Sequence, residues 1–400
     1  MHGRLVLATG SLLLVALGLA GCRDASQRRA QLVVGTFWTG TSSQALQREL
    51  VRIAHDLGPV NIEVRTFTRT ALLDHLDRTQ PGQGREALDL AIVPHDWLGR
   101  LVQRDTIGEL PTERALVLKQ RVVAQAMTAV TEHGRVFGYP LSAQVLALVY
   151  DPALFGHAPR SIAEILSTHL PPEVLPLALD LRSPDALAPL VGSQQGTLAD
   201  ADGDLLWRLP EVAEVLRRLA PAWASPSGWR VCRGSDLESL QLQLFAEGRL
   251  ASFITGPWLL EALESCGHPF AVMPIPPLAD SAAPSRALVG YECVVVTRES
   301  RWGDLALQVG ARLLDARANE RLNRTTRRLP VLLRAYESKP ASAPGSFGFL
   351  RALEQGQFVP STDLWNQGFR EAEQQLDRFA GRDHPPAVDE IAAVLAGGPR

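Results

Sequence analysis

The sequence predicts an α/β protein with two globular halves, each built around a mostly parallel β-sheet that helices cover. Three observations lead to this prediction. Strand-like and helix-like segments alternate over residues 31–130. Two strand-like runs then follow each other closely at 136–150, and such a pair could carry the chain from one half into the other. Finally, the roughly 370 residues beyond the N-terminal segment exceed the usual size of one domain.

The first predicted half shows the alternation most clearly. An apolar run at 31–37 indicates a buried strand, and the next helix keeps its apolar residues on one face and stops at Gly58. Further strands are expected at 60–64 and 88–93. Helices are expected at 70–78, 98–103 and 114–130. Strands that alternate with helices in this order favour parallel pairing and coverage of both faces of the sheet.

The second predicted half has shorter elements. Ser235 and Glu238 have the spacing of a capping box, in which a hydroxyl and a carboxylate satisfy free N–H groups at a helix start. That box predicts a helix that ends at Gly248, and the last hundred residues are expected to be largely helical. A further helix is expected at 211–219, and strands at 136–141, 146–150, 177–181, 251–255, 270–273 and 293–296.

The N-terminus has the features of an export signal. Arg4 is followed by an uncharged run at 5–20, which is short for a membrane span and typical of a signal peptide. The run ends in Leu19-Ala20-Gly21-Cys22, which resembles a bacterial lipobox. The resemblance implies a lipoprotein signal peptide at 1–21, lipidation of Cys22 and a polar tether at 22–30. An ordinary signal peptide or a buried helix is the alternative.

Composition and cysteine spacing exclude several classes of protein. The formal net charge of −3 gives no electrostatic case for binding nucleic acid. Cys232, Cys266 and Cys293 are too widely spaced for a zinc pattern, so no metal and no cofactor are expected. In an exported chain Cys232 and Cys266 could form a disulfide, and buried free thiols are an equal alternative. The chain contains no Gly-x-Ser-x-Gly or His-Glu-x-x-His motif, so it is not expected to be an enzyme.

Four segments, taken in order, resemble the maltose-binding-protein-like extracellular solute-binding proteins of ABC transporters. The first is the Tyr-Pro strand and apolar strand at 138–151. The second, at 245–258, is a helix, a glycine turn, a strand and Gly256-Pro257-Trp258. The third combines 272–277 with Val289-Gly290-Tyr291, and the fourth runs from Phe358 to Trp365. Together they cover essentially the whole mature chain.

The resemblance implies the two-lobed fold of type II periplasmic binding proteins, with hinged lobes and a ligand in the cleft between them. Lobe I would comprise 31–142 and 294–333, and lobe II 147–288 and 340–400. Hinge crossings would lie at 142–147, 288–294 and 333–340. Ligands bind such open α/β sheets at the carboxyl ends of the strands.

Aromatic and acidic residues at predicted strand ends are the first candidates for a sugar site, because sugars present both C–H faces and hydroxyl rims. Trp258 and Trp365 match stacking tryptophans of the family, although either could instead pack within or between the lobes. Asp96 stands at the position of an acidic hydroxyl binder, and its alternative is a helix N-cap. Trp97 replaces a basic residue of the maltodextrin binders and could add a stacking face.

Four polar residues complete the predicted site. Thr41 lies in the first strand–helix turn, whose hydroxyls and N–H groups suit a polar ligand, although Ser42 or Ser43 could simply cap the helix. Gln144 stands where maltodextrin binders carry a carboxylate, and its amide can still bond hydroxyls. Arg182 and Asp185 align with another ligand segment. These departures put maltose itself in doubt and leave a sugar in general as the expected ligand.

The sequence therefore predicts a monomeric, lipid-anchored, extracytoplasmic protein that binds a sugar-like ligand and delivers it to an ABC permease by hinge closure. Two alternatives stay open. The same fold could serve a sensor or scaffold, or Asp96 and Asp185 could act as paired carboxylates in a lipid-anchored hydrolase.

Overall fold

The computed structural model describes residues 30–78, 87–200, 204–233, 236–280, 282–337 and 344–397. The predicted signal peptide, Cys22 and the predicted tether up to residue 29 lie outside the described residues. The strands are β1 (Ala30–Thr36), β2 (Val60–Thr66), β3 (Leu90–Pro94), β4 (Thr131–Glu132), β5 (Arg135–Val136), β6 (Tyr139–Val145), β7 (Ala147–Tyr150), β8 (Ser252–Thr255), β9 (Ala271–Met273), β10 (Leu288–Val296) and β11 (Gln357–Phe358).

Helices follow the strands in the order that the sequence predicts, and the last hundred residues are largely helical. The helices are α1 (Gly40–Leu57), α2 (Arg69–Arg78), the 3-10 turn η2 (His95–Trp97), α3 (Leu98–Gln103), α4 (Thr112–Lys119), α5 (Ala124–Thr128), α6 (Ile162–Ser167), α7 (Pro184–Gln195), α8 (Leu209–Trp223), α9 (Pro226–Val231), α10 (Leu237–Ala246), the 3-10 turn η3 (Pro257–Leu259), α11 (Leu260–Ser265), α12 (Gly303–Leu313), α13 (Ala316–Thr326), α14 (Leu333–Glu337), α15 (Pro344–Gln355), α16 (Asp363–Ala380) and α17 (Ile391–Leu395). The single helix expected at 114–130 is two helices, α4 and α5.

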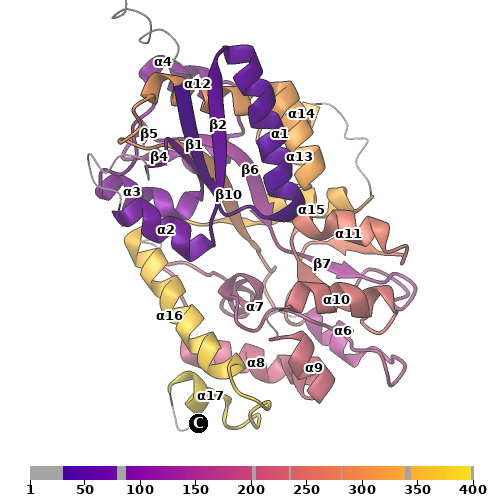
Figure 1. The fold of residues 1–400 in the computed structure, drawn as a ribbon. Coiled ribbons are helices and arrows are strands. Elements are labelled where there is room, and N and C mark those ends of the chain that lie inside the picture. Colours follow the sequence, from indigo (N-terminus) through magenta and orange to yellow (C-terminus); the bar gives the residue numbers. More distant parts are fainter. Residues whose placement is uncertain are drawn as a thin grey trace, which may run out of the picture.

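The larger sheet has the strand order β11-β10-β3-β1-β2, with β6 paired to β10. Strand β1 is parallel to β2 and β3, as expected for strands joined through helices α1 and α2. Strand β10 runs antiparallel to both β3 and β6. Figure 1 shows α1 and α13 beside one another along this sheet. The apolar face of α1, with Leu46, Leu50 and Ile53 buried, accounts for the position of that helix.

The smaller sheet has the order β8-β7-β9, and β7 is antiparallel to both neighbours. The prediction of a mostly parallel sheet therefore does not hold for the named strands of this half. The reason is the path of the chain. Helix α11 joins β8 to β9 as a crossover would, but β7 enters between them directly from β6 and runs the other way. The strand expected at 177–181 is only an isolated parallel bridge, between Ala178 and Phe253.

Two lobes surround these two sheets, and a single residue separates the sheets at the first connection. Strand β6 ends at Val145 in the larger sheet and β7 begins at Ala147 in the smaller one, so Leu146 alone joins them. In Figure 1 the larger sheet occupies the upper part of the molecule, and α7, α8 and α9 occupy the lower part. The residue boundaries of the lobes stay a prediction. Within the segment assigned to lobe II, β11 pairs with β10 of the larger sheet.

Three further features concern the cysteines, metal ligands and helices of the described residues. Cys232, Cys266 and Cys293 are all free, so the pair Cys232 and Cys266 forms no disulfide here. Among the described residues, no group of three or more acidic, histidine or cysteine side chains is placed to hold a metal ion. None of the described helices combines the length and the apolar character needed to span a membrane.

Candidate functional site

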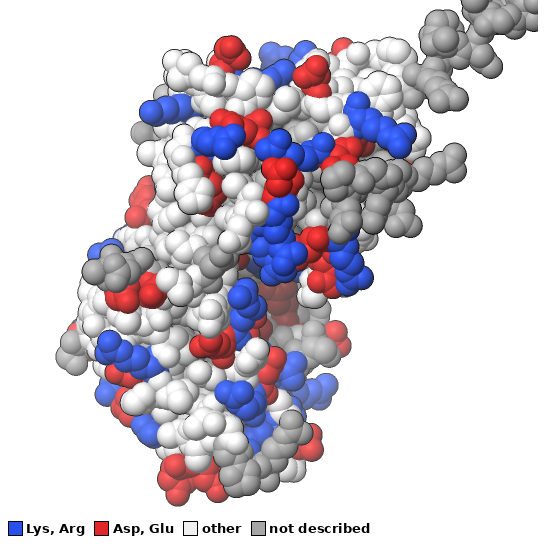
Figure 2. Space-filling view, turned by 90° about the vertical axis from the view of Figure 1, so that its left-hand side faces the viewer, with Lys and Arg blue, Asp and Glu red and all other residues white. Residues whose placement is uncertain are grey.

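A cavity of about 880 Å³ lies between the two sheets. Its wall includes the segments that follow β3 and β8, parts of β6 and β10, and residues of α2, α7 and α16. Figure 2 shows a hollow between the upper and lower parts of the molecule, with charged side chains around it. The volume is within the range of small-molecule sites, and strand ends in an α/β sheet are where such sites occur.

Trp258 gives the cavity a partly exposed aromatic face on the side of the smaller sheet. The indole folds back over Gly256, where a Cβ atom would lie only 2.0 Å from the ring. Glycine before Pro257 is therefore a steric requirement of this ring position. The indole Nε1–H donates to Glu238 Oε1 at 2.7 Å. Backbone and carboxylate together hold the ring at the cavity wall.

Glu238, one half of the predicted capping box, also contributes to the cavity wall. Helix α10 begins after Asp236, and no side chain caps it in the described residues. Ser235, the other half of the predicted capping box, lies outside the described residues. The carboxylate accepts from Trp258 because η3 follows β8 directly and brings the indole against the first turn of α10.

The turn after β3 places Asp96 and Trp97 in the opposite wall. Its anchor is His95, which is 1% exposed. The Tyr291 N–H donates to His95 Nδ1 at 3.1 Å, and His95 Nε2 lies 2.7 Å from the Val359 carbonyl oxygen. Burial lowers the pKa of His95, so the ring is neutral, with its proton on Nε2. A neutral ring in this tautomer satisfies both partners.

Arg69 of α2 lies beside the acidic part of the cavity wall. Its guanidinium lies 3.7 Å from Asp96 and 5.8 Å from the centre of the Trp97 ring. Across the cavity, burial raises the pKa of Asp185 to about 6, and the positive charge of Arg69 opposes that shift. Burial also raises the pKa of Glu373. Among the described residues, no Lys, Arg or His side chain lies within 4 Å of either carboxylate as an ion-pair partner.

The floor of the cavity is formed by two paired strands. Gln144 of β6 lies opposite Gly290 of β10, and both residues line the cavity. A Cβ atom at Gly290 would meet no other atom within 4 Å, so this glycine leaves open space. Thr255, at the end of β8, is 2% exposed, and its Oγ1 has no hydrogen-bond partner among the described residues.

The structure brings together most of the residues predicted from the sequence. Six of the eight predicted binding residues line the cavity: Asp96, Trp97, Gln144, Asp185, Trp258 and Trp365. Thr41 and Arg182 are exposed and are not part of the wall. Their roles in binding stay predictions, as does that of every residue in the predicted site.

The alternative roles considered for these residues have different outcomes. Trp365 is only 1% exposed, so its ring is packed within the protein at the cavity wall, and its predicted stacking role stays a prediction. Asp96 lies inside η2, whose N-cap is Pro94, and so it does not cap a helix. The N-cap of α1 is Thr39, without a side-chain bond, and Ser42 accepts instead from Arg328.

Several wall residues were not predicted from the sequence. Arg69 and Glu373 lie on helix surfaces, where a charged residue is ordinarily exposed to water and carries no signal. The sequence does single out Glu292, because it is the only charged residue in the apolar strand β10. A carboxylate in a buried strand must be paired or hydrogen bonded, and this expectation could have identified it.

A family of proteins described as bacterial extracellular solute-binding proteins matches this sequence over residues 54–347. The chain is also 22% identical to a maltotriose-binding protein of Pyrococcus abyssi (strain GE5 / Orsay) over 204 residues. That alignment covers 49% of this chain and 43% of the relative, so the chain matches less than half of the relative's length.

Solved structures show the same fold at low sequence identity. The structure of the Thermus thermophilus maltotriose-binding protein with maltotriose has a TM-score of 0.71 at 19% identity, covering 91% of this chain and 98% of that one. The GacH receptor of Streptomyces glaucescens, solved unliganded and with acarbose, has a TM-score of 0.78 at 17% identity. In that case the match covers 92% of this chain and 97% of the receptor.

Proposed function

Because the chain belongs to the bacterial extracellular solute-binding protein family, we propose that it binds a sugar or oligosaccharide between its lobes and delivers it to an ABC importer. Membership confirms the resemblance predicted from the sequence and implies an extracytoplasmic location. The similar proteins are binding proteins, and we propose that this chain, too, performs no chemistry on its ligand.

The composition of the cavity is the observation that supports a sugar ligand most. Trp258 and Trp97 provide aromatic surface, while Gln144 and Asp185 provide hydrogen-bonding groups in the same wall. A sugar needs both kinds of surface, because its C–H patches stack on rings and its hydroxyls require donors and acceptors. The volume of about 880 Å³ accommodates a small ligand of this kind.

We further propose that the lobes close around the sugar by bending at the crossings near 142–147, 288–294 and 333–340. The ligand would favour the closed form through contacts that it gains with both lobes only on closure. We propose that Asp96 and Trp97 on one side, and Asp185 and Trp258 on the other, make these contacts, because all four line the cavity. The closed form would then dock on the permease.

Lipidation of Cys22 is a separate proposal, and it rests on the lipobox-like sequence alone. Metabolic labelling with a radioactive fatty acid should mark the wild-type chain and leave Cys22→Ala unmarked. Equal labelling of both chains would contradict the anchor and leave the binding function untouched.

The binding function is tested by a thermal-shift screen of residues 23–400, produced without the signal peptide. Neutral mono- and oligosaccharides form one set, and amino acids and dicarboxylates of similar size form a matched set. A sugar that binds only the folded chain must raise its melting temperature. A shift with the second set and none with any sugar would refute the proposal.

A further inference from the structure

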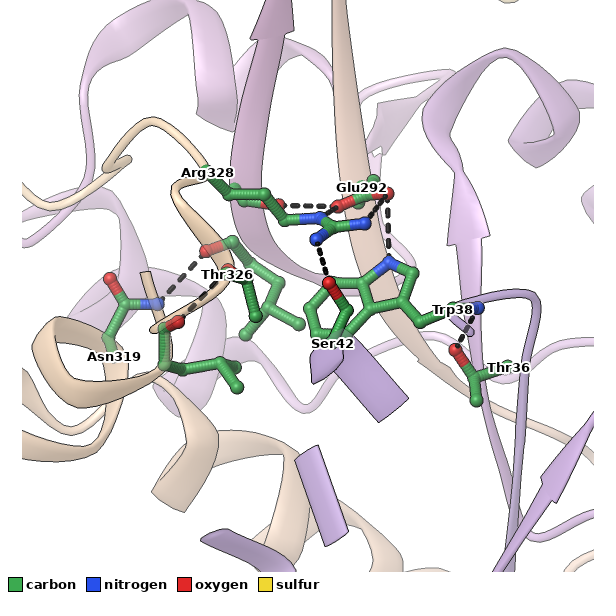
Figure 3. Close-up of polar contacts among 10 residues, drawn as sticks. Thr36, Trp38, Ser42, Glu292, Asn319, Thr326 and Arg328 are labelled. Carbon is green, nitrogen blue, oxygen red and sulfur yellow. Dashed lines mark hydrogen bonds and ion pairs between the residues drawn. The ribbon is translucent and has the colours of Figure 1, made fainter. Parts of the chain in front are cut away.

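A buried carboxylate lies at the base of the cavity and accepts hydrogen bonds from three other segments of the chain (Figure 3). Glu292 of β10 is 2% exposed. Its Oε1 accepts from Trp38 Nε1 at 2.8 Å, and its Oε2 accepts from the Ser142 hydroxyl at 2.7 Å. Arg328 Nε donates to Oε2 at 2.6 Å, and a second Arg328 nitrogen lies 3.4 Å from Oε1.

Arg328 is almost as deeply buried as its partner, with 8% of its side chain exposed. Its guanidinium lies 4.0 Å from the centre of the Trp38 ring and donates to the Ser42 hydroxyl at 3.0 Å. A guanidinium stacked on a ring and paired in this way is strongly oriented. Removing one partner of such a buried pair would leave an uncompensated charge. We call Trp38, Ser42, Ser142, Glu292 and Arg328 the base cluster.

The base cluster joins the segments that lead into the predicted hinge crossings. Ser142 lies on β6 at the start of the first crossing, Glu292 on β10 within the second, and Arg328 shortly before the third. Backbone bonds between Ala143 and Leu329 reinforce this connection in both directions, at 2.9 and 3.3 Å. The pairing of β10 with β6 also changes register between Glu292 and Cys293, which turns the strand at this point.

Pairing between the crossing strands stops abruptly on the side of the smaller sheet. β6 and β10 are paired from the base cluster as far as Val145 opposite Val289. Leu146 has no partner in either sheet, and the next strand begins at Ala147. The first two crossings are therefore held together up to the cavity floor, and the first is free of sheet pairing at one residue only.

We propose that Glu292 is a positioning residue that clamps the first two crossings, and the segment before the third, on the side of lobe I and so confines bending in the first crossing to Leu146. Its carboxylate already accepts four contacts from protein donors, so it acts through Arg328, Trp38 and Ser142 and does not bind the ligand directly. This inference rests on the proposed function, because it concerns how the lobes of a binding protein move.

The test uses the ligand-free chain first. Spin labels on Gln47 of α1 and Ser227 of α9, both exposed, report the distance between the lobes in a chain with Cys266 replaced by serine. The variants are Glu292→Gln, Arg328→Met and the double variant, which removes both charges. The control is the ion pair between Glu49 and Arg321, which joins α1 to α13 away from the cavity wall.

If Glu292 acts as a clamp, both single variants and the double variant should show a broader distribution of interlobe distances than the wild-type chain. The double variant should have a melting temperature closer to wild type than the single variants, while its distance distribution stays broad. Glu49→Gln should lower the melting temperature and keep the narrow distribution. A distribution that follows melting temperature across all variants, the control included, would show a purely structural role and overturn the inference.

Titration with maltotriose separates this inference from the proposed function. If maltotriose binds the wild-type chain, Glu292→Gln should weaken binding at least tenfold and Glu49→Gln should not change it. Affinity unchanged in Glu292→Gln would overturn the clamp and leave the function intact. If neither maltotriose nor any other sugar binds, the function fails while the ligand-free distances still decide the clamp.

Discussion

The carboxylates in the two walls of the cavity differ in how many hydrogen bonds they accept from the protein. On the side of the larger sheet, Glu292 is almost fully buried and its oxygens are occupied by protein donors. On the side of the smaller sheet, Asp185 lies in the wall without an ion pair, and burial raises its pKa to about 6. We infer that the saturated carboxylate makes a rigid base, whereas the carboxylate of Asp185 is available to the proposed ligand.

The largest expected effect is on the saturated side. Replacing Arg328 by methionine leaves the Glu292 charge buried without its partner, which should lower the free energy of unfolding by about 3–5 kcal/mol. Chemical denaturation followed by circular dichroism measures this change. The matched variant Arg218→Met breaks an exposed pair with Glu214 on α8 and should change stability by less than about 1 kcal/mol. Equal losses of stability in the two variants would contradict the claim that Glu292 and Arg328 form a buried, saturated pair.

Removing the charge of Asp185, in the smaller-sheet wall, should have the opposite effect and raise the free energy of unfolding. The raised pKa of Asp185 means that its stabilising contribution is complete below about pH 4 and is lost as the pH rises through 6. Asp185→Asn carries no charge, so it should raise the free energy of unfolding at pH 7 by roughly 1–3 kcal/mol and leave it unchanged near pH 4.

Denaturation curves at several pH values test this prediction. The exposed carboxylate of Asp56 on α1 provides the control, and Asp56→Asn should show no comparable gain at pH 7. A loss of stability in Asp185→Asn at pH 7 would mean that Asp185 is satisfied within the protein. It would then resemble Glu292, and the contrast would disappear.

A third prediction concerns the aromatic part of the smaller-sheet wall. Trp258→Ala should weaken sugar binding by about 2 kcal/mol, because the indole offers a stacking face at the cavity. Calorimetric titration with the best sugar from the screen gives this number. Trp302 is 40% exposed and not part of the wall, so Trp302→Ala is the control and should bind normally. Unchanged affinity in Trp258→Ala would exclude stacking.

The smallest effect is expected at Glu238, whose carboxylate accepts the hydrogen bond from that indole. Glu238→Ala removes the acceptor of the 2.7 Å bond from Trp258 and should weaken sugar binding by about 1 kcal/mol. Glu238→Gln keeps an oxygen acceptor and should recover most of the affinity. If both variants bind alike, the bond does not position the ring.

The sequence predicts the elements of this fold better than the contacts among them. Alternation of apolar and polar residues locates β1 to β3 and α1, because the period of a strand or helix is a local property. The antiparallel position of β7 between β8 and β9 depends on where the chain passes from the larger sheet to the smaller one, and a local sequence pattern does not predict that point. The short strand β11 is not predicted from the sequence either, because its pairing with β10 arises only in the tertiary structure.

The same distinction separates the parts of the site that were predicted from those that were not. Trp258 stands in a short motif, Gly256-Pro257-Trp258, whose chemistry can be read locally. Trp38 and Glu292 are 254 positions apart, and only folding brings them together. Thr41 was placed in the site from its turn, but the structure directs Trp38 and Ser42 of that turn toward Arg328 and leaves Thr41 exposed.

The central claim, that the cavity between the lobes is the binding site, is tested most directly by filling it. Gly290 has no positive φ, and a Cβ atom there meets nothing within 4 Å, so Gly290→Leu should fold with an unchanged melting temperature and place its side chain over the cavity floor. Calorimetric titration with a sugar that binds the wild-type chain should then show no binding. Wild-type affinity in Gly290→Leu would place the ligand elsewhere and contradict the claim.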